Sequence, residues 1–169
     1  MFALRATRLV ICVGIAVLWA LAAGPSAWAW AWPADGAVLR EFSVETDKYA
    51  GGQHRGIDIG VGNASAIRAP VAGEVTFAGE VPTHGLTVTI ATGEHKASLT
   101  HLGSLRVKRG ERVTEGAPIA SPGPSGEPEH GVPYVHLGIR IGEDEYVDPL
   151  GLLPPRRKIP QFPISLDTK

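Results

Sequence analysis

The sequence predicts a mainly β domain whose short strands form an antiparallel sheet. Glycine and proline supply 21 and 14 of the 169 residues, and such frequent turn residues favour short strands over long helices. Several segments also alternate apolar and polar side chains with a period of two, as half-buried strands do. After residue 29, no segment keeps apolar residues at helical spacing over several turns.

The first 29 residues have the three parts of a secretory signal peptide. Arg5 and Arg8 precede an apolar run over 9–23, and Ala27-Trp28-Ala29 supplies the small residues of a cleavage site. The run has about 15 residues, whereas a membrane-spanning helix needs roughly 20. We therefore expect a helical signal peptide over 1–29 and, after its removal, a secreted or extracytoplasmic domain without membrane contact. A retained N-terminal anchor is the alternative.

Charge and cysteine content exclude several function classes. Lys and Arg total 16 against 17 Asp and Glu, and this balance argues against a nucleic-acid partner. Cys12, the only cysteine, lies in the predicted signal peptide, so the exported domain has no disulfide and no thiol nucleophile. We expect the domain, a monomer, over 30–153. An irregular tail with a solvated basic cluster at 156–158 is expected over 154–169.

Strand alternation is clearest in three segments of the expected domain. Residues 74–77 and 86–90 alternate apolar with polar side chains. The clearest strand covers 134–141, where four aliphatic residues alternate with more polar or smaller ones. Residues 121–133, rich in Pro, Gly, Ser and Glu, predict a loop that leads directly into this strand.

His54 and Asp58 lie four residues apart in a glycine-rich segment. Interior glycines disfavour a helix there, at about 1 kcal/mol each relative to alanine. In an extended segment the even spacing puts both side chains on one face, while Ile57 and Ile59 point into the core. An imidazole beside a carboxylate is a suitable ligand pair for Zn²⁺. The alternative is a surface histidine beside a surface aspartate in a turn.

His136 and His101 extend this candidate site. His136 lies on the polar side of the strand over 134–141, so it faces either solvent or a site. His101 ends a strand-like segment. Two histidines and one aspartate with one open position would form a catalytic zinc arrangement, and a further histidine would assist proton transfer.

Several motifs follow one another over residues 32–149. They are His-Arg-Gly-Ile-Asp-Ile-Gly from His54, Ala-Pro-Val-Ala-Gly-Glu-Val from Ala69, the pair His101-Leu102, the segment 110–119, and His-Leu-Gly-Ile-Arg from His136. Together and in this order they resemble the LytM/lysostaphin-type zinc metallopeptidases. These are secreted endopeptidases that cut peptide cross-links in bacterial peptidoglycan.

The resemblance implies a fold, a metal and a set of roles. The implied fold is an antiparallel β-sheet groove or sandwich of the duplicated hybrid motif type, with the reacting amide laid across the metal. The resemblance also implies that His54, Asp58 and His136 bind Zn²⁺ with water as the fourth ligand. It implies that His101 is the catalytic histidine outside the ligand set.

Tyr134 stands where the family has the first histidine of its H-x-H motif. The family assigns proton transfer to that histidine, and a phenol with a pKa near 10 cannot act as a base at neutral pH. Tyr134 is expected either to donate a hydrogen bond to a developing oxyanion or only to pack within its strand. His101 could take both roles, and His130 or Glu129 of the adjacent loop are further substitutes.

Three functions of different classes follow. The expected function is a secreted zinc metalloendopeptidase that acts on stem peptides or cross-links of peptidoglycan, with His101 and Tyr134 as catalytic residues. The alternative is a weak or inactive relative that binds peptidoglycan or activates a cell-wall amidase, as the missing histidine suggests. A biotinyl or lipoyl carrier, suggested by the strand-turn pattern over 69–77, would need a modifiable lysine at a hairpin tip that is absent there.

Overall fold

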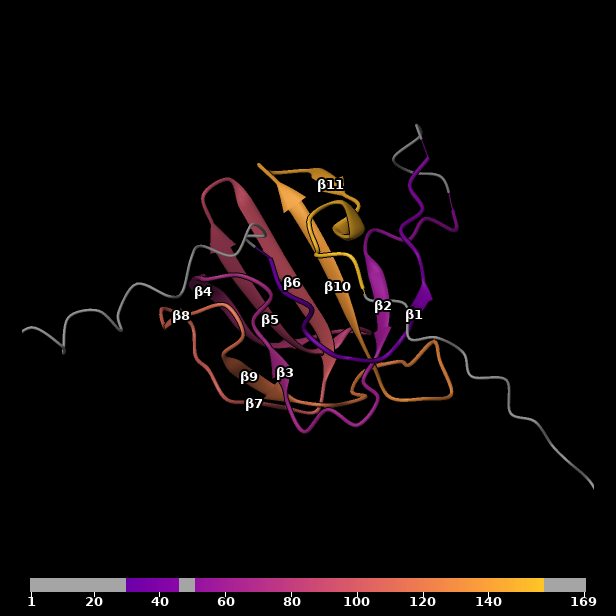
Figure 1. Ribbon diagram of the computed structural model, residues 1–169, viewed down its shortest axis with the longest axis horizontal. Helices are drawn as coiled ribbons and strands as arrows, with labels where there is room; N and C mark the ends of the chain where they lie inside the picture. Colours follow the sequence, from indigo (N-terminus) through magenta and orange to yellow (C-terminus); the bar gives the residue numbers. More distant parts are fainter. Residues whose placement is uncertain (1–29, 46–50, 157–169) are drawn as a thin grey trace, which may run out of the picture.

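A computed structural model of the chain describes residues 30–45 and 51–156, and these form almost entirely antiparallel β-structure (Figure 1). The strands are β1 (Val38–Arg40), β2 (Ile57–Gly60), β3 (Ile67–Arg68), β4 (Gly73–Val81), β5 (Gly85–Thr92), β6 (His95–Leu102), β7 (Ser104–Leu105), β8 (Arg112–Val113), β9 (Pro118–Ser121), β10 (Tyr134–Ile141) and β11 (Glu145–Val147). Among the described residues the only helix is the 3-10 helix η1 (Pro149–Gly151). The mainly β prediction is confirmed.

The predicted signal peptide over 1–29 lies outside the described residues. Within the part of the chain that is described, no helix has the length and apolar character needed to cross a membrane.

Two antiparallel sheets build the domain. The larger sheet has eight strands in the order β1-β2-β10-β6-β5-β4-β8, with β11 paired to β10, and the smaller has the order β3-β9-β7. β10 is central, because β6 pairs along one edge while β2 and β11 pair with successive parts of the other. Strands that are distant in the sequence therefore lie side by side at β10 (Figure 1).

The alternation predicted over 134–141 divides β10 into a core face and a polar face. Val135, Leu137 and Ile139 are fully buried in a hydrophobic cluster that includes residues of both sheets. Ile57 and Ile59 of β2 enter the same cluster, as the period of two predicts. Burial of each such side chain contributes about 1.5–3 kcal/mol, so the core fixes which residues of β2 and β10 face the other way.

The segment after η1 closes the domain against the N-terminal segment. The Trp32 indole donates to the Pro154 carbonyl at 2.8 Å, and the Arg156 guanidinium lies 3.7 Å from the centre of the Trp32 ring. Arg156 also donates to backbone carbonyls of residues 34–36. The prediction of a solvated basic cluster at 156–158 is therefore wrong for Arg156. Residues 157–169 lie outside the described part of the chain.

The loop between β9 and β10 is held against the turn that joins β4 to β5. Ser125 Oγ accepts the Leu86 amide at 2.7 Å, and the Glu127 amide donates to the Thr83 carbonyl at 2.8 Å. A further bond, from the Glu129 amide to the Tyr134 hydroxyl at 3.1 Å, ties the loop to β10. These contacts fix a segment whose composition predicted only irregular structure.

Candidate metal centre

The register between β2 and β10 brings Asp58 and His136 together. The two residues are direct partners across the antiparallel pair, so their side chains share one face of the sheet. His54 precedes β2 and is held by a bridge to Ser43. Two segments 78 residues apart in the sequence thus supply adjacent side chains.

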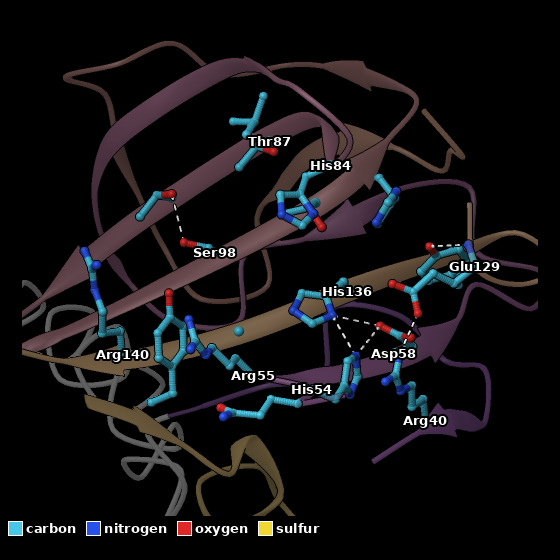
Figure 2. Close-up of a pocket in the computed structure, with 18 of the residues that line it drawn as sticks. Arg40, His54, Arg55, Asp58, His84, Thr87, Ser98, Glu129, His136 and Arg140 are labelled. Atoms are coloured by element: carbon cyan, nitrogen blue, oxygen red, sulfur yellow. Dashed lines mark hydrogen bonds and ion pairs between the residues drawn. The ribbon is translucent and has the colours of Figure 1, made fainter. Parts of the chain in front are cut away.

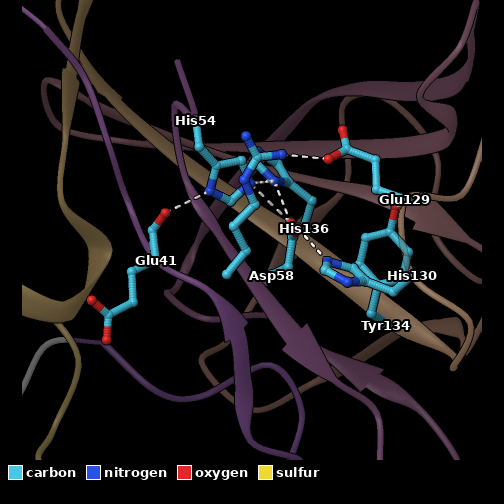
Figure 3. A network of polar contacts seen from close by, with 8 residues as sticks. Glu41, His54, Asp58, Glu129, His130, Tyr134 and His136 are labelled. Atoms are coloured by element: carbon cyan, nitrogen blue, oxygen red, sulfur yellow. Dashed lines mark hydrogen bonds and ion pairs between the residues drawn. The ribbon is translucent and has the colours of Figure 1, made fainter. Parts of the chain in front are cut away.

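Three ligand-type atoms converge at this point (Figure 3). His54 Nε2 lies 3.1 Å from Asp58 Oδ1 and 3.2 Å from His136 Nδ1, and His136 Nδ1 lies 2.8 Å from Asp58 Oδ1. His54 Nδ1 donates to the Glu41 carbonyl at 2.8 Å, which leaves the lone pair of Nε2 facing the other two atoms. Metal-binding histidines use their second nitrogen in this way.

These atoms fit a zinc ion in both chemistry and spacing. Ligands at about 2.0–2.1 Å around a tetrahedral Zn²⁺ are about 3.3 Å apart, close to the three separations found here. Imidazole nitrogen and carboxylate oxygen are both zinc ligands. Because a lone pair of His54 Nε2 faces a carboxylate oxygen, a cation between them would remove the repulsion.

The electrostatics of Asp58 keep it ionised. Burial by itself raises the pKa of this carboxyl, whose side chain is only 2% exposed, but hydrogen bonds from His136 and His130, and the positive charges that His136 and His54 carry when they are protonated, outweigh it. The net effect lowers the pKa of Asp58 from 3.8 to about 2. The carboxylate is therefore deprotonated, as a metal ligand must be, across the neutral range.

His130 is part of this cluster, although its loop gave little reason to expect that. Its Nε2 lies 2.7 Å from Asp58 Oδ2, the carboxylate oxygen that does not face His54 (Figure 3). From the sequence, His130 and Glu129 are expected only as loop residues that could replace the missing general base. Glu129 instead pairs with the Arg40 guanidinium. The signal that could have identified His130 is its position four residues before β10, within reach of the ligands.

His101, the last residue but one of β6, has a strained conformation and lines the same groove as the three ligand candidates. Its φ of +61° is in the left-handed region, which costs a non-glycine residue about 1–3 kcal/mol. Its amide donates to the His84 carbonyl, and Nδ1 donates to the Ser125 carbonyl at 2.9 Å. The lone pair of Nε2 is thereby left for another partner. Such strain at a buried histidine is typical of a functional site.

Tyr134 lies between His101 and His130. Its ring centre is 4.9 Å from that of His101 and 4.6 Å from that of His130. The hydroxyl accepts the Glu129 amide and retains its own hydrogen to donate. Burial raises the pKa of the Tyr134 phenol above 10, so at neutral pH this group is a donor and not a base.

A groove of about 670 Å³ opens over these side chains (Figure 2). Its walls come from the polar faces of β5, β6 and β10 and include His54, Asp58, His101 and His136. Thr100, the register partner of His136 on β6, is buried, and its hydroxyl has no hydrogen-bond partner among the described residues. An unsatisfied buried hydroxyl is costly, which favours a bound group that meets it in the groove.

Replacing Gly56 by alanine is expected to weaken metal binding by about 10- to 100-fold, as displacement of a supporting group does. A Cβ at Gly56 would lie 2.6 Å from His136 Nε2 and closer still to the Leu137 carbonyl, so the imidazole must move. Zinc competition titration measures the effect, with circular dichroism to verify the fold. Gly51→Ala is the matched control, since nothing lies within 4 Å of its Cβ. Unchanged zinc affinity in Gly56→Ala would contradict this account of the position of His136.

Comparison with known proteins gives the same assignment as the motifs. Residues 52–149 match the family described as Peptidase family M23. The Lipoprotein NlpD/LppB homolog of Pseudomonas aeruginosa is 32% identical over 136 residues, covering 79% of this chain and 43% of that protein. The Murein hydrolase activator NlpD of Salmonella dublin is 30% identical over 130 residues, covering 76% of this chain and 32% of that protein. The chain spans less than half the length of these two curated relatives.

Solved structures agree on the fold. A mutant of the catalytic domain of the prophage-encoded M23 protein EnpA from Enterococcus faecalis superposes with a TM-score of 0.58 at 25% identity. The match covers 70% of this chain and 94% of that one. The family match alone covers more than half of the sequence and contains the three candidate ligands. The chain therefore belongs to peptidase family M23 and has the antiparallel β fold of the LytM/lysostaphin-type peptidases.

Proposed function

We propose that this chain is a zinc-dependent endopeptidase that hydrolyses peptides of bacterial peptidoglycan. The observation that carries the proposal is the convergence of His54, Asp58 and His136, whose nearest ligand atoms are 2.8–3.2 Å apart, in the wall of a groove. Peptidoglycan as the target is supported by the relative from Salmonella dublin, which is named a murein hydrolase activator.

The three side chains would hold zinc and leave one position open, as in catalytic zinc sites. When bound, zinc supplies a Lewis acid that polarises a carbonyl and makes water a better nucleophile at neutral pH. The chain itself orients the ligands: the Glu41 carbonyl holds His54, and His130 holds the second oxygen of Asp58. Fixed ligands lose little freedom when the site is occupied.

His101 is the general base and acid in this proposal. Its Nδ1–H is committed to the Ser125 carbonyl, so Nε2 can accept a proton from the attacking water and return it to the leaving amine. The C–N bond of the substrate breaks as the amine nitrogen takes that proton. Tyr134 would donate its remaining hydroxyl hydrogen to the developing oxyanion, or it would only pack beside His101.

Activation of another murein hydrolase is the second candidate function. Two observations favour it: the name of the Salmonella relative, and Tyr134 in place of a histidine that the family uses for proton transfer. Loss of a general base typically costs about 10²–10⁴ in rate, so activity could be low. Retention of all three ligand candidates favours the enzyme, because an activator alone has no need of them.

A lysis assay separates the two candidates. We expect the purified chain to contain one equivalent of zinc. It should also lower the turbidity of a cell-wall suspension, and a chelator should prevent this fall. Tyr134→His, which restores the family's histidine, is expected to raise the lysis rate. Zinc without lysis in both the native chain and Tyr134→His would reject the enzyme. In that case, stimulation of an added cell-wall amidase would identify the activator.

The proposed site of action is outside the cytoplasm. The predicted signal peptide over 1–29 supports export, and relatives named lipoproteins support a place at the cell envelope. Peptidoglycan peptides are the proposed partner, and the chain is expected to act as a monomer.

A further inference from the structure

We propose that the groove binds a carboxylate of its peptide substrate through Lys96 and Arg140, at the end remote from the candidate metal centre. This inference rests on the proposed function, because it specifies the substrate chemistry of the same groove. Both residues line that groove, and Figure 2 shows Arg140 at the opposite end from Glu129, with His136 and Asp58 between them.

Lys96 and Arg140 form a like-charge pair built into the sheet. They are direct partners in the register of β6 and β10, which places their Cβ atoms about 5 Å apart on one face. Like charges directly opposite on neighbouring strands destabilise a sheet. An anion bound between them would offset this repulsion, which gives the pair a use in ligand binding.

No carboxylate of the described chain neutralises the pair. Among the described residues neither Lys96 nor Arg140 forms an ion pair. The acidic residues in the groove wall are Asp58 and Glu129, and both are engaged elsewhere, with histidines and with Arg40 respectively. A substrate carboxylate would therefore meet no competing internal partner.

The path from the metal centre to this pair suits an extended peptide. His136, Gly138 and Arg140 occupy one face of β10, and four residues of strand span about 13 Å. Thr100, Ser98 and Lys96 are their register partners on β6. Ser98 and Gly138, at the middle of the two strands, line the groove, and the unpartnered Thr100 hydroxyl is available to a substrate amide. The carboxylate would thus belong to a residue about four positions from the scissile bond.

Tyr146 and Arg55 bound the same end of the groove. Tyr146 pairs with Arg140 across β10 and β11, and the Arg55 guanidinium lies 5.5 Å from the centre of the Tyr146 ring. A guanidinium over an aromatic face makes a favourable cation–π contact, so Arg55 and Tyr146 together form the wall at this end of the groove.

Binding of free and amidated substrate tests the subsite. The probes are a cross-linked muropeptide dimer with free carboxylates and the same dimer with its carboxylates converted to amides. Isothermal titration with the purified chain, in chelator so that no cleavage occurs and with the fold verified by circular dichroism, gives both affinities. We expect the free form to bind about five- to tenfold more tightly, and the preference to weaken at high salt.

The double variant Lys96→Met, Arg140→Gln is expected to bind both forms equally. Its Tm should be unchanged or higher, because the substitution removes like-charge repulsion. Arg112→Gln is the matched control, since Arg112 is 83% exposed on β8 outside the groove, and it should keep the preference. Equal binding of both forms by the native chain, or a preference that survives in the double variant, would overturn the inference. Absence of lysis with the preference intact would instead reject only the proposed enzyme.

Discussion

Replacement of His54 by alanine is expected to abolish zinc binding and cell-wall lysis together. His54 provides one of three converging ligand atoms, and its orientation is fixed by the Glu41 carbonyl. With one ligand removed, we expect zinc affinity to fall by more than about 100-fold, beyond the cost of losing an outer-sphere partner. Metal analysis after dialysis and the turbidity assay measure the two effects.

His84→Ala is the matched control for metal content. His84 is an exposed histidine that lines the same groove, and it contacts His101 through its backbone carbonyl and, edge to face, through its ring. It is not one of the three converging ligand candidates. That variant should retain a full equivalent of zinc. If His54→Ala kept its zinc under the same dialysis, the three converging atoms would not be the metal site and the proposed function would lose its basis.

Replacement of His101 is expected to leave zinc in place and slow turnover by about 10²–10⁴, the usual contribution of a general base. His101 Nδ1 bonds to a backbone carbonyl, and the residue is not one of the three converging ligands. The prediction therefore separates occupancy of the site from rate. Metal content should stay the same while the initial rate of lysis falls.

Two substitutions distinguish the imidazole from the backbone strain at this position. Alanine retains the unfavourable φ of +61°, whereas asparagine tolerates the left-handed region better. Both variants should lose activity to a similar extent, and His101→Asn should be the more stable to heat. Loss of zinc from both variants, to the same degree as from His54→Ala, would show that the division of roles is wrong.

The polar face of β10 illustrates how much the sequence could predict. The period of two put His136 opposite the aliphatic residues, and the glycine-rich segment put His54 and Asp58 on one face of an extended chain. Hydrophobic burial of Ile57, Ile59 and Leu137 enforces those directions. The family motifs then indicated which of the six histidines belong together.

Loop residues show where prediction from the sequence ended. His130 lies in a segment rich in proline and glycine, whose composition indicates only that it is irregular. Its contact with Asp58 depends on bonds from the loop to Thr83, Leu86 and Tyr134. Thr83 and Leu86 belong to the β4–β5 hairpin and Tyr134 to β10, so no pattern local to the loop encodes the final position of the imidazole.

Local chemistry in the sequence determined the strands, the faces of their side chains and the residue types able to bind a metal, because these depend on neighbours within a few positions. Only the tertiary structure decided that Asp58 and His136 are partners, that His130 reaches the second carboxylate oxygen, and that Lys96 opposes Arg140. Strand register and loop docking arise from packing between segments tens of residues apart. Such contacts are stabilised only when the segments pack together in the folded core, so no single segment of the sequence determines them.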